Sequence, residues 1–283
     1  MIHPLPVIAL AAKLTGVGLW LTQHPSAAVV AFFLPDPFLL HAMLVPSGQG
    51  FCRVFTRFVS DRPAVWLTID DGPDEVDTPQ LLDLLDRHGA RATFFVIGER
   101  AARWPHLIDE IVRRGHEIGH HTHTHPAATF WCALPGRVQR ELDQTLHVLS
   151  RTGVRPRWFR APVGIKPFCL GAVLNRRGLH YVGWSIRSGD CHSRTAEQLV
   201  ARIAPQLRPG AIILLHEGPS VPGPVRVRGV GLLLEEIARR NLACIIPDPA
   251  QLRSGAPRKA ERGGVAGKFI PPLPDAGAAA GRS

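Results

Sequence analysis

Histidines are concentrated in one short stretch of the chain, and neutral imidazole is the commonest metal ligand in proteins. Five of the 14 histidines fall within ten residues, namely His116, His120, His121, His123 and His125. Two pairs, His116/His120 and His121/His125, are four residues apart, so each could converge on one ion if the segment turned helically. Some of these side chains could equally belong to a solvated polar loop. The density predicts a metal site that uses two of them.

Two adjacent carboxylates, Asp70 and Asp71, follow an apolar, β-rich run at residues 64–69. The next residues, Gly72 and Pro73, impose a turn, so the two acids can point in different directions and have different roles. An Asx-type turn that caps the following helix is the simpler interpretation of this motif taken alone. With two histidines, Asp71 would complete a set of two His and one carboxylate that leaves positions open for water and substrate.

Four ordered motifs within residues 64–246 carry a resemblance to a known family. They are TIDDGP, HTHTH, RAPVG and ILLH, and they resemble the T-F-D-D-G-P, H-[ST]-x-x-H, R-x-P-x-G and Leu-His motifs of the polysaccharide deacetylases, also called the NodB-homology domain or carbohydrate esterase family 4. The family has an irregular (β/α) barrel with fewer than eight strands. The resemblance therefore implies the α/β class, with an irregular, incomplete barrel.

The resemblance also implies roles for individual residues. Asp70 corresponds to the general base and His216 to the general acid. Asp71, His121 and His125 correspond to the ligands of a divalent metal, usually Zn²⁺ and in some members Co²⁺ or Ni²⁺. The remaining site candidates are the base-holding Arg160, the oxyanion-stabilising peptide N–H of Val163, and two residues near the substrate, Pro162 and Trp184. His120 and His123 are assigned to the loop surface or to a layer behind the ligands.

Two departures from the family pattern affect the predicted acid and the sugar site. Where the family often has D-x-x-D-W, this chain has Arg187 in place of the first acid and Asp190 in place of the second. Asp190 could be the partner of His216, or Arg187 could bind an anionic group of the substrate. Val163 stands where an aromatic residue is frequent. A non-catalytic sugar-binding or metal-binding membrane protein is therefore the alternative to an enzyme.

Alternating segments predict the elements that position these residues. Strands are expected at residues 64–69, 92–97, 158–160, 180–186, 211–215 and 242–246, and helices at residues 79–87, 101–114, 137–150, 169–177, 196–206 and 231–240. The deacetylase domain would span residues 64–250, which is shorter than the roughly 250 residues of an eight-fold barrel. Residues 51–63 are expected to be a linker and residues 251–283 a disordered tail.

Residues 1–50 are expected to attach the chain to a membrane. Two apolar runs, 5–22 and 27–45, each approach the roughly 20 residues that span a bilayer, although Lys13 interrupts the first and Pro35-Asp36-Pro37 the second. A hairpin or single anchor is favoured over a signal peptide, because no early basic cluster or small-residue cleavage site is present. This predicts a protein of the bacterial inner membrane with lipid as a partner. Which side carries the catalytic domain depends on whether one run or both span.

Charge and cysteine usage narrow the function further. The formal net charge is +10, but the basic residues are spread along the chain rather than gathered with aromatics on one element, which argues against nucleic acid. The five cysteines form no CxxC pair, so neither a zinc knuckle nor a disulfide framework is indicated. A two-His-carboxylate site also occurs in iron oxygenases, but those would be expected on an all-β scaffold. The loop at residues 218–229 is expected to border the site, with Arg226 and Arg228 acting on anionic substrates; a solvated connecting loop is the alternative.

The sequence thus predicts a metal-dependent hydrolase that removes N-acetyl or other N-acyl groups from amino sugars. Its substrate would be an N-acetylated glycan, either a cell-envelope polysaccharide, an oligosaccharide or a lipid-linked glycan.

Overall fold

The computed structural model describes residues 4–255, and its central feature is a curved parallel sheet. The strand order is β1–β7–β6–β5–β4–β3–β9–β8, with β10 also pairing with β3. All of these pairs are parallel. The bounds are β1 (Val54–Phe55), β3 (Ala64–Gly72), β4 (Ala92–Val96), β5 (Glu117–His120), β6 (Trp158–Phe159), β7 (His180–Val182), β8 (Ile186–Arg187), β9 (Ile212–His216) and β10 (Ala243–Cys244). The predicted α/β fold with an incomplete barrel is confirmed.

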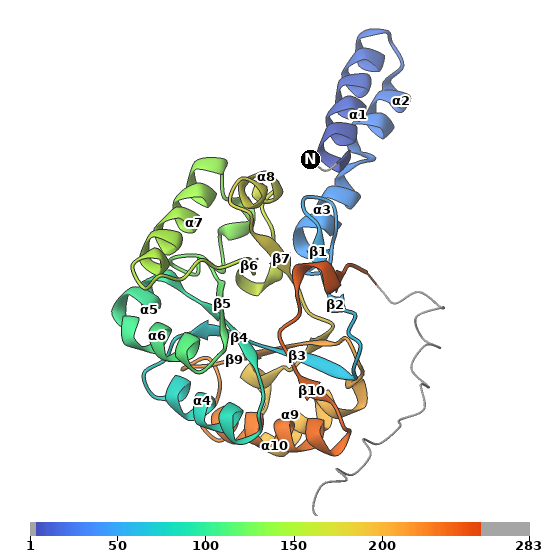
Figure 1. Cartoon of the computed structure of the whole chain (residues 1–283). Coiled ribbons are helices and arrows are strands. Elements are labelled where there is room, and N and C mark those ends of the chain that lie inside the picture. Colours follow the sequence, from blue (N-terminus) through green and yellow to red (C-terminus); the bar gives the residue numbers. More distant parts are fainter. Residues whose placement is uncertain (1–3, 256–283) are drawn as a thin grey trace, which may run out of the picture.

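Helices surround this sheet (Figure 1). They are α4 (Asp77–Arg87), α5 (Gly98–Arg103), α6 (Pro105–Arg113), α7 (Pro135–Ser150), α8 (Leu170–Asn175), α9 (Ala196–Ile203) and α10 (Arg226–Arg239). In β3, Val65, Leu67 and Ile69 belong to the core cluster that includes buried residues of α4 and α10. Trp66 belongs to a different cluster, inside the barrel. Because side chains alternate along a strand, Thr68 and Asp70 lie on the same face of β3 as Trp66, which faces the barrel interior. Asp70 therefore lies in the interior at the carboxyl end of the strand.

Two of the predicted elements are divided in the structure. The helix expected at 101–114 is two helices, α5 and α6, since the residue before a proline is pushed away from helical geometry and Trp104 has φ −128° and ψ 63°. The strand expected at 180–186 is also two, because β7 pairs with β1 and β6 whereas β8 pairs with β9. The break between them at Gly183 and Trp184 frees Trp184 to face the pocket described below.

The segments on either side of the barrel domain are more ordered than predicted. Within the expected linker, β1 joins the main sheet and β2 (Arg57–Phe58) pairs antiparallel with β11 (Leu252–Arg253). Phe58 and Leu252 are buried in the same cluster as Trp66. The linker prediction therefore fails for these strands, and the tail prediction fails for residues 251–253, because these apolar side chains cover one end of the barrel core. The rest of the predicted tail, residues 256–283, lies outside the described residues.

The N-terminal region forms three helices, α1 (Pro4–Leu21), α2 (Pro25–Phe33) and α3 (Asp36–Leu44), here called the N-terminal hairpin. It projects from the barrel, with α1 and α2 side by side (Figure 1). By length and composition, two stretches, Pro4–Leu21 and Pro25–Leu44, could cross a membrane, and only 11% and 17% of them is buried. They could serve as a membrane anchor or a signal sequence. The two polar interruptions meet, because Lys13 Nζ lies 2.7 Å from Asp36 Oδ1 and 3.1 Å from the Phe32 carbonyl.

Candidate active site

The end of β3 separates the two adjacent carboxylates. Asp70 is 3% exposed and faces the barrel interior, whereas Asp71 has a φ of 72° and lies at a register shift between β3 and β4. The turn continues through Gly72, where a Cβ atom would overlap the buried carboxyl group of Glu217, so a larger residue would require Glu217 to move. The two acids at this strand end face different main partners, Arg160 for Asp70 and His125 for Asp71, and both lie within 3.7 Å of His121 Nε2.

Asp71, His121 and His125 bring three donor atoms together, all within 4.8 Å of one another. Asp71 Oδ1 lies 3.3 Å from His125 Nε2 and 3.6 Å from His121 Nε2, and this buried oxygen accepts no hydrogen bond from the described residues. Burial and the neighbouring His125 lower the pKa of His121 to about 3, so its imidazole is neutral. Its Nδ1 donates to the Arg160 carbonyl at 2.9 Å, which leaves Nε2 as a bare acceptor. Acceptor atoms that face one another fit a cation between them, and the donor set suits Zn²⁺.

The histidines do not converge by helical spacing. Residues 121–125 form a turn in which Thr122 has φ 64° and His125 has φ 52°. His116 is buried away from the three donors, beside Phe94, and its Nδ1 accepts from the Ala92 N–H.

His120 and His123 lie behind the ligand turn. His120 is completely buried, which excludes the loop-surface alternative and places it in the layer behind the candidate ligands; its ring contacts the Leu142 carbonyl at 3.0 Å and accepts from the Thr122 N–H at 3.0 Å. The His123 N–H donates to Glu141 Oε2. Both residues therefore help to hold the turn that carries His121 and His125.

Arg160 is fully buried and holds Asp70. Its Nη1 donates to Asp70 Oδ1 at 2.6 Å and to Thr68 Oγ1 at 2.9 Å, while its other nitrogens donate to the carbonyls of Val182 and Gly183. Burial raises the pKa of Asp70, and the charge and hydrogen bond of Arg160 act in the opposite direction. A raised carboxyl pKa is what a general base working near neutral pH needs.

His216 lies across the pocket and is paired with Asp190. Asp190 Oδ1 lies 2.9 Å from His216 Nδ1, and Asp190 Oδ2 accepts the His216 N–H at 2.7 Å. Burial alone would lower the pKa of His216, but the hydrogen bonds with Asp190 and Cys191 and the charges of Asp190 and Asp70 raise it to about 11. The ring is therefore an imidazolium at neutral pH, which is the form that can donate a proton. Of the two alternatives left open by the sequence, Asp190 occupies the partner position.

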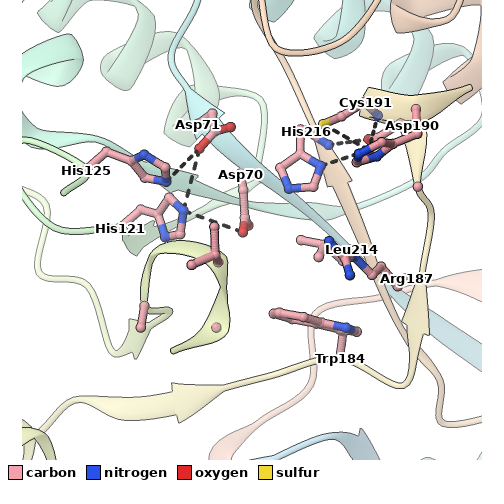
Figure 2. Close-up of a pocket in the computed structure, with 15 residues that line it drawn as sticks. Asp70, Asp71, His121, His125, Trp184, Arg187, Asp190, Cys191, Leu214 and His216 are labelled. Carbon is pink, nitrogen blue, oxygen red and sulfur yellow. Dashed lines mark hydrogen bonds and ion pairs between the residues drawn. The ribbon is translucent and has the colours of Figure 1, made fainter. Parts of the chain in front are cut away.

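These groups line one pocket of about 220 Å³. Figure 2 shows Asp71, His121 and His125 on one side, His216 and Asp190 on the other, and Asp70 between them. Val163, Trp184 and Arg187 also line it. The side chain of Arg187 is exposed and makes no hydrogen bond or ion pair with residues 4–255. Arg160 and Pro162 are buried behind the lining rather than part of it.

Comparisons with known proteins identify this arrangement. The family model described as "Polysaccharide deacetylase" matches residues 59–182. A chitooligosaccharide deacetylase of Bradyrhizobium sp. is 36% identical over 196 residues, covering 65% of this chain and 88% of that protein. The chain belongs to the polysaccharide deacetylase family. It is accordingly a hydrolase of the deacetylase class, which confirms the predicted family and enzyme class.

Two further relatives agree with this membership. A peptidoglycan-N-acetylglucosamine deacetylase of Bacillus cereus is 31% identical over 182 residues, covering 64% of this chain and 83% of that protein. Among solved structures, the family 4 carbohydrate esterase from Streptomyces lividans in complex with acetate superposes with a TM-score of 0.61 at 29% identity, covering 69% of this chain and 98% of that one.

The loop at 218–229 borders the deacetylase site, but not through its arginines. Ser220 Oγ donates to Asp71 Oδ2 at 3.3 Å. Arg226 is instead paired with the buried Asp77 at 3.3 Å, and Arg228 with Glu197 at 2.6 Å, and neither lines the pocket. The predicted action of Arg226 and Arg228 on anionic substrates was therefore wrong, because nearby acids on α4 and α9 take up both charges.

Sequence reasoning missed several pocket residues. Cys191 and His192, which follow Asp190 in a 3-10 turn, line the pocket beside Leu214. The sequence signal for both residues is the RSGDCH segment, which departs from the family pattern and also contains Arg187 and Asp190. Glu217, which does not line the pocket, was also missed; it is buried beside Gly72, and burial raises its pKa to about 8.

Proposed function

We propose that this deacetylase depends on a divalent metal, and that it removes N-acetyl or other N-acyl groups from amino sugars of a cell-envelope polysaccharide, an oligosaccharide or a lipid-linked glycan. The observation that carries the proposal is the convergence of Asp71, His121 and His125 beside a buried base, with a protonated histidine across the same pocket. Zn²⁺ suits two imidazoles and one carboxylate best, and Co²⁺ or Ni²⁺ would also be accepted.

Each residue of the site then has a separate role in the reaction. A metal ion held by Asp71, His121 and His125 would supply Lewis-acid polarisation of the acyl carbonyl and of water. Asp70 removes a proton from the attacking water, and Arg160 keeps that carboxylate in place. The peptide N–H of Val163 stabilises the developing oxyanion. His216, charged through its pairing with Asp190, protonates the departing nitrogen.

Several features support the choice of substrate. The relatives are named for chitooligosaccharide and for peptidoglycan N-acetylglucosamine, so an N-acetylated amino sugar is the expected unit. We assign the N-terminal hairpin the role of an anchor in the bacterial inner membrane, because its exposed surface is apolar. A membrane location favours cell-envelope or lipid-linked glycans, and the unpaired Arg187 at the pocket suits a substrate that carries an anionic group.

The alternative, a binding protein without turnover, rested on the replacement of an acid by Arg187. The pairing of Asp190 with His216 supports turnover, since the acid needed to charge the histidine is supplied from three residues further along the chain.

The test measures bound metal and acetate release on the same samples of the full chain. Asp70→Asn should retain the metal and lose about 10² or more in kcat. Asp71→Ala should lose the metal as well as turnover. Asp143→Asn is the matched control, because that exposed acid pairs with Arg177 far from the pocket lining. Wild-type protein that binds no divalent metal, or that releases no acyl group from any glycan with metal bound, would contradict the proposal.

A further inference from the structure

The wall of the active site that carries Val163 is built against the end of the N-terminal hairpin. The wall is the 3-10 turn Pro162–Gly164 (η2), in which Val163 has φ 49° and Gly164 has φ 77°. A Cβ atom at Gly164 would lie 2.7 Å from Pro46 Cβ and 2.7 Å from the Trp184 ring. Gly164 is thus held between Pro46, two residues beyond α3, and Trp184, which lines the pocket.

One ammonium group ties the turn to the hairpin. Lys166 is fully buried, and its Nζ donates to the carbonyls of Val45 at 2.7 Å, Pro46 at 3.1 Å and Gly164 at 3.3 Å. Its backbone N–H donates to the Met43 carbonyl at 3.0 Å. An ammonium has three N–H groups and no acceptor, so all of its donors are used. A buried ammonium is costly unless it is paired or fully hydrogen-bonded. Lys166 has no carboxylate partner within residues 4–255; three carbonyls take up its N–H groups, and its Nζ lies 5.5 Å from the centroid of the Tyr181 ring.

These contacts join two parts of the chain that the sequence separates by more than a hundred residues. Residues 43–46 offer Lys166 backbone carbonyls, and the turn contributes the carbonyl of Gly164, which also accepts from Tyr181 Oη. In the fold, α3 lies between the α1–α2 pair and the barrel (Figure 1). A displacement of the hairpin would remove carbonyl partners from Lys166 and release the turn that carries Val163.

We propose that Lys166 is a positioning residue that fastens residues 43–46 to the turn Pro162–Gly164, so that the end of the N-terminal hairpin forms part of the active-site wall. This rests on the proposed function, in which the Val163 peptide N–H acts on the oxyanion. Because that interaction forms only as the reaction proceeds, loosening the turn lowers kcat more than it raises KM.

The test compares variants of the full chain in detergent micelles. Lys166→Met removes the three side-chain hydrogen bonds, and Pro46→Gly removes the ring beside Gly164 and serves if Lys166→Met fails to fold. Arg177→Met is the matched control, because it also removes three side-chain hydrogen bonds, two to Asp143 and one to Val173, away from the pocket. Loss of a whole oxyanion donor costs about 10² to 10³ in kcat, so a displaced donor should cost about tenfold, with KM changed by less than about twofold.

A second readout does not depend on turnover. In Lys166→Met the amides of Ile165 and Lys166, which donate to Pro162 and Met43, should exchange with solvent faster, while the amide of Gly98, which donates to Thr122, keeps its rate. Wild-type kcat and exchange in both variants, or an equal loss in Arg177→Met, would overturn the proposal. A wild-type chain without any deacetylation would instead refute the proposed function, and the exchange rates would still decide whether Lys166 couples the hairpin to the turn.

Discussion

Replacing Asp190 by Asn should lower the pH above which the enzyme loses activity. The amide would keep the shape of the Asp190 side chain but remove the charge that faces His216. The ring pKa, raised to about 11 in the wild type, should return to the ordinary value of about 6.5, because burial then lowers it while the charge of Asp70 still raises it. At pH 8 an imidazole with that pKa is only about 3% protonated, so kcat/KM should fall about 30-fold. At pH 6 most of it stays protonated, and the loss should be below about twofold.

The assay is the pH profile of kcat/KM for acyl release between pH 6 and pH 10, on protein with measured metal content. Asp143→Asn again serves as the control, since it removes one exposed acid without touching His216. The reasoning is refuted if Asp190→Asn lowers activity by the same factor at pH 6 and pH 8, because His216 would then not be the proton donor that Asp190 charges.

Three other substitutions test separate parts of the site. Glu217 has a pKa of about 8 in the folded chain against 4.5 in the unfolded chain, so its burial destabilises the fold increasingly as pH rises from 4.5 to 8. Glu217→Gln should therefore raise the free energy of unfolding at pH 8.5 by at least about 1 kcal/mol. Urea titration measures this gain, and at pH 4 there should be none. Arg187→Gln should raise KM about tenfold for a phosphate-bearing glycan and leave KM for a neutral one unchanged; equal effects on both substrates would contradict its assignment. Val163→Gly should raise the free energy of unfolding by about 1 kcal/mol, because a β-branched residue at φ 49° is strained, whereas Val163→Ala, which keeps the Cβ atom, should gain less.

The parts of the site that the sequence predicted are those determined by local geometry. Asp70 could be placed at a strand end because a long apolar run precedes it. The alternation of side chains along that strand also determines which face of the sheet Asp70 lies on. The turn at Gly72 and Pro73 predicted that Asp70 and Asp71 can point in different directions, and in the structure Asp70 pairs with Arg160 and Asp71 with His125. Such features depend on a few neighbouring residues, which a sequence displays directly.

The parts that the sequence left open depend on contacts between distant segments. Whether Asp190 is the partner of His216 depends on the pairing of β8 with β9, which brings the two segments together and which no spacing within either segment reveals. His120 is buried because it ends β5 between β4 and β6, and α7 places the Leu142 carbonyl at its ring. Lys13 interrupts an apolar helix when read alone, but Asp36 from the next run meets it. In each case the position and role of the residue depend on a partner from a distant segment, which the residue's own sequence neighbours do not reveal.

Backbone strain at the site shows how these distant contacts serve the chemistry. Of the six non-glycine residues with positive φ among residues 4–255, four lie at the pocket or between its ligands: Asp71, Thr122, His125 and Val163. Each such conformation costs on the order of 1–3 kcal/mol and persists only where neighbouring structure imposes it. Here those constraints are visible, since His120 and Gly98 hold the backbone of Thr122 and Lys166 holds the turn behind Val163. The buried scaffold therefore holds the proposed metal ligands and the proposed oxyanion donor in fixed positions, an arrangement that would require little reorganisation during the reaction.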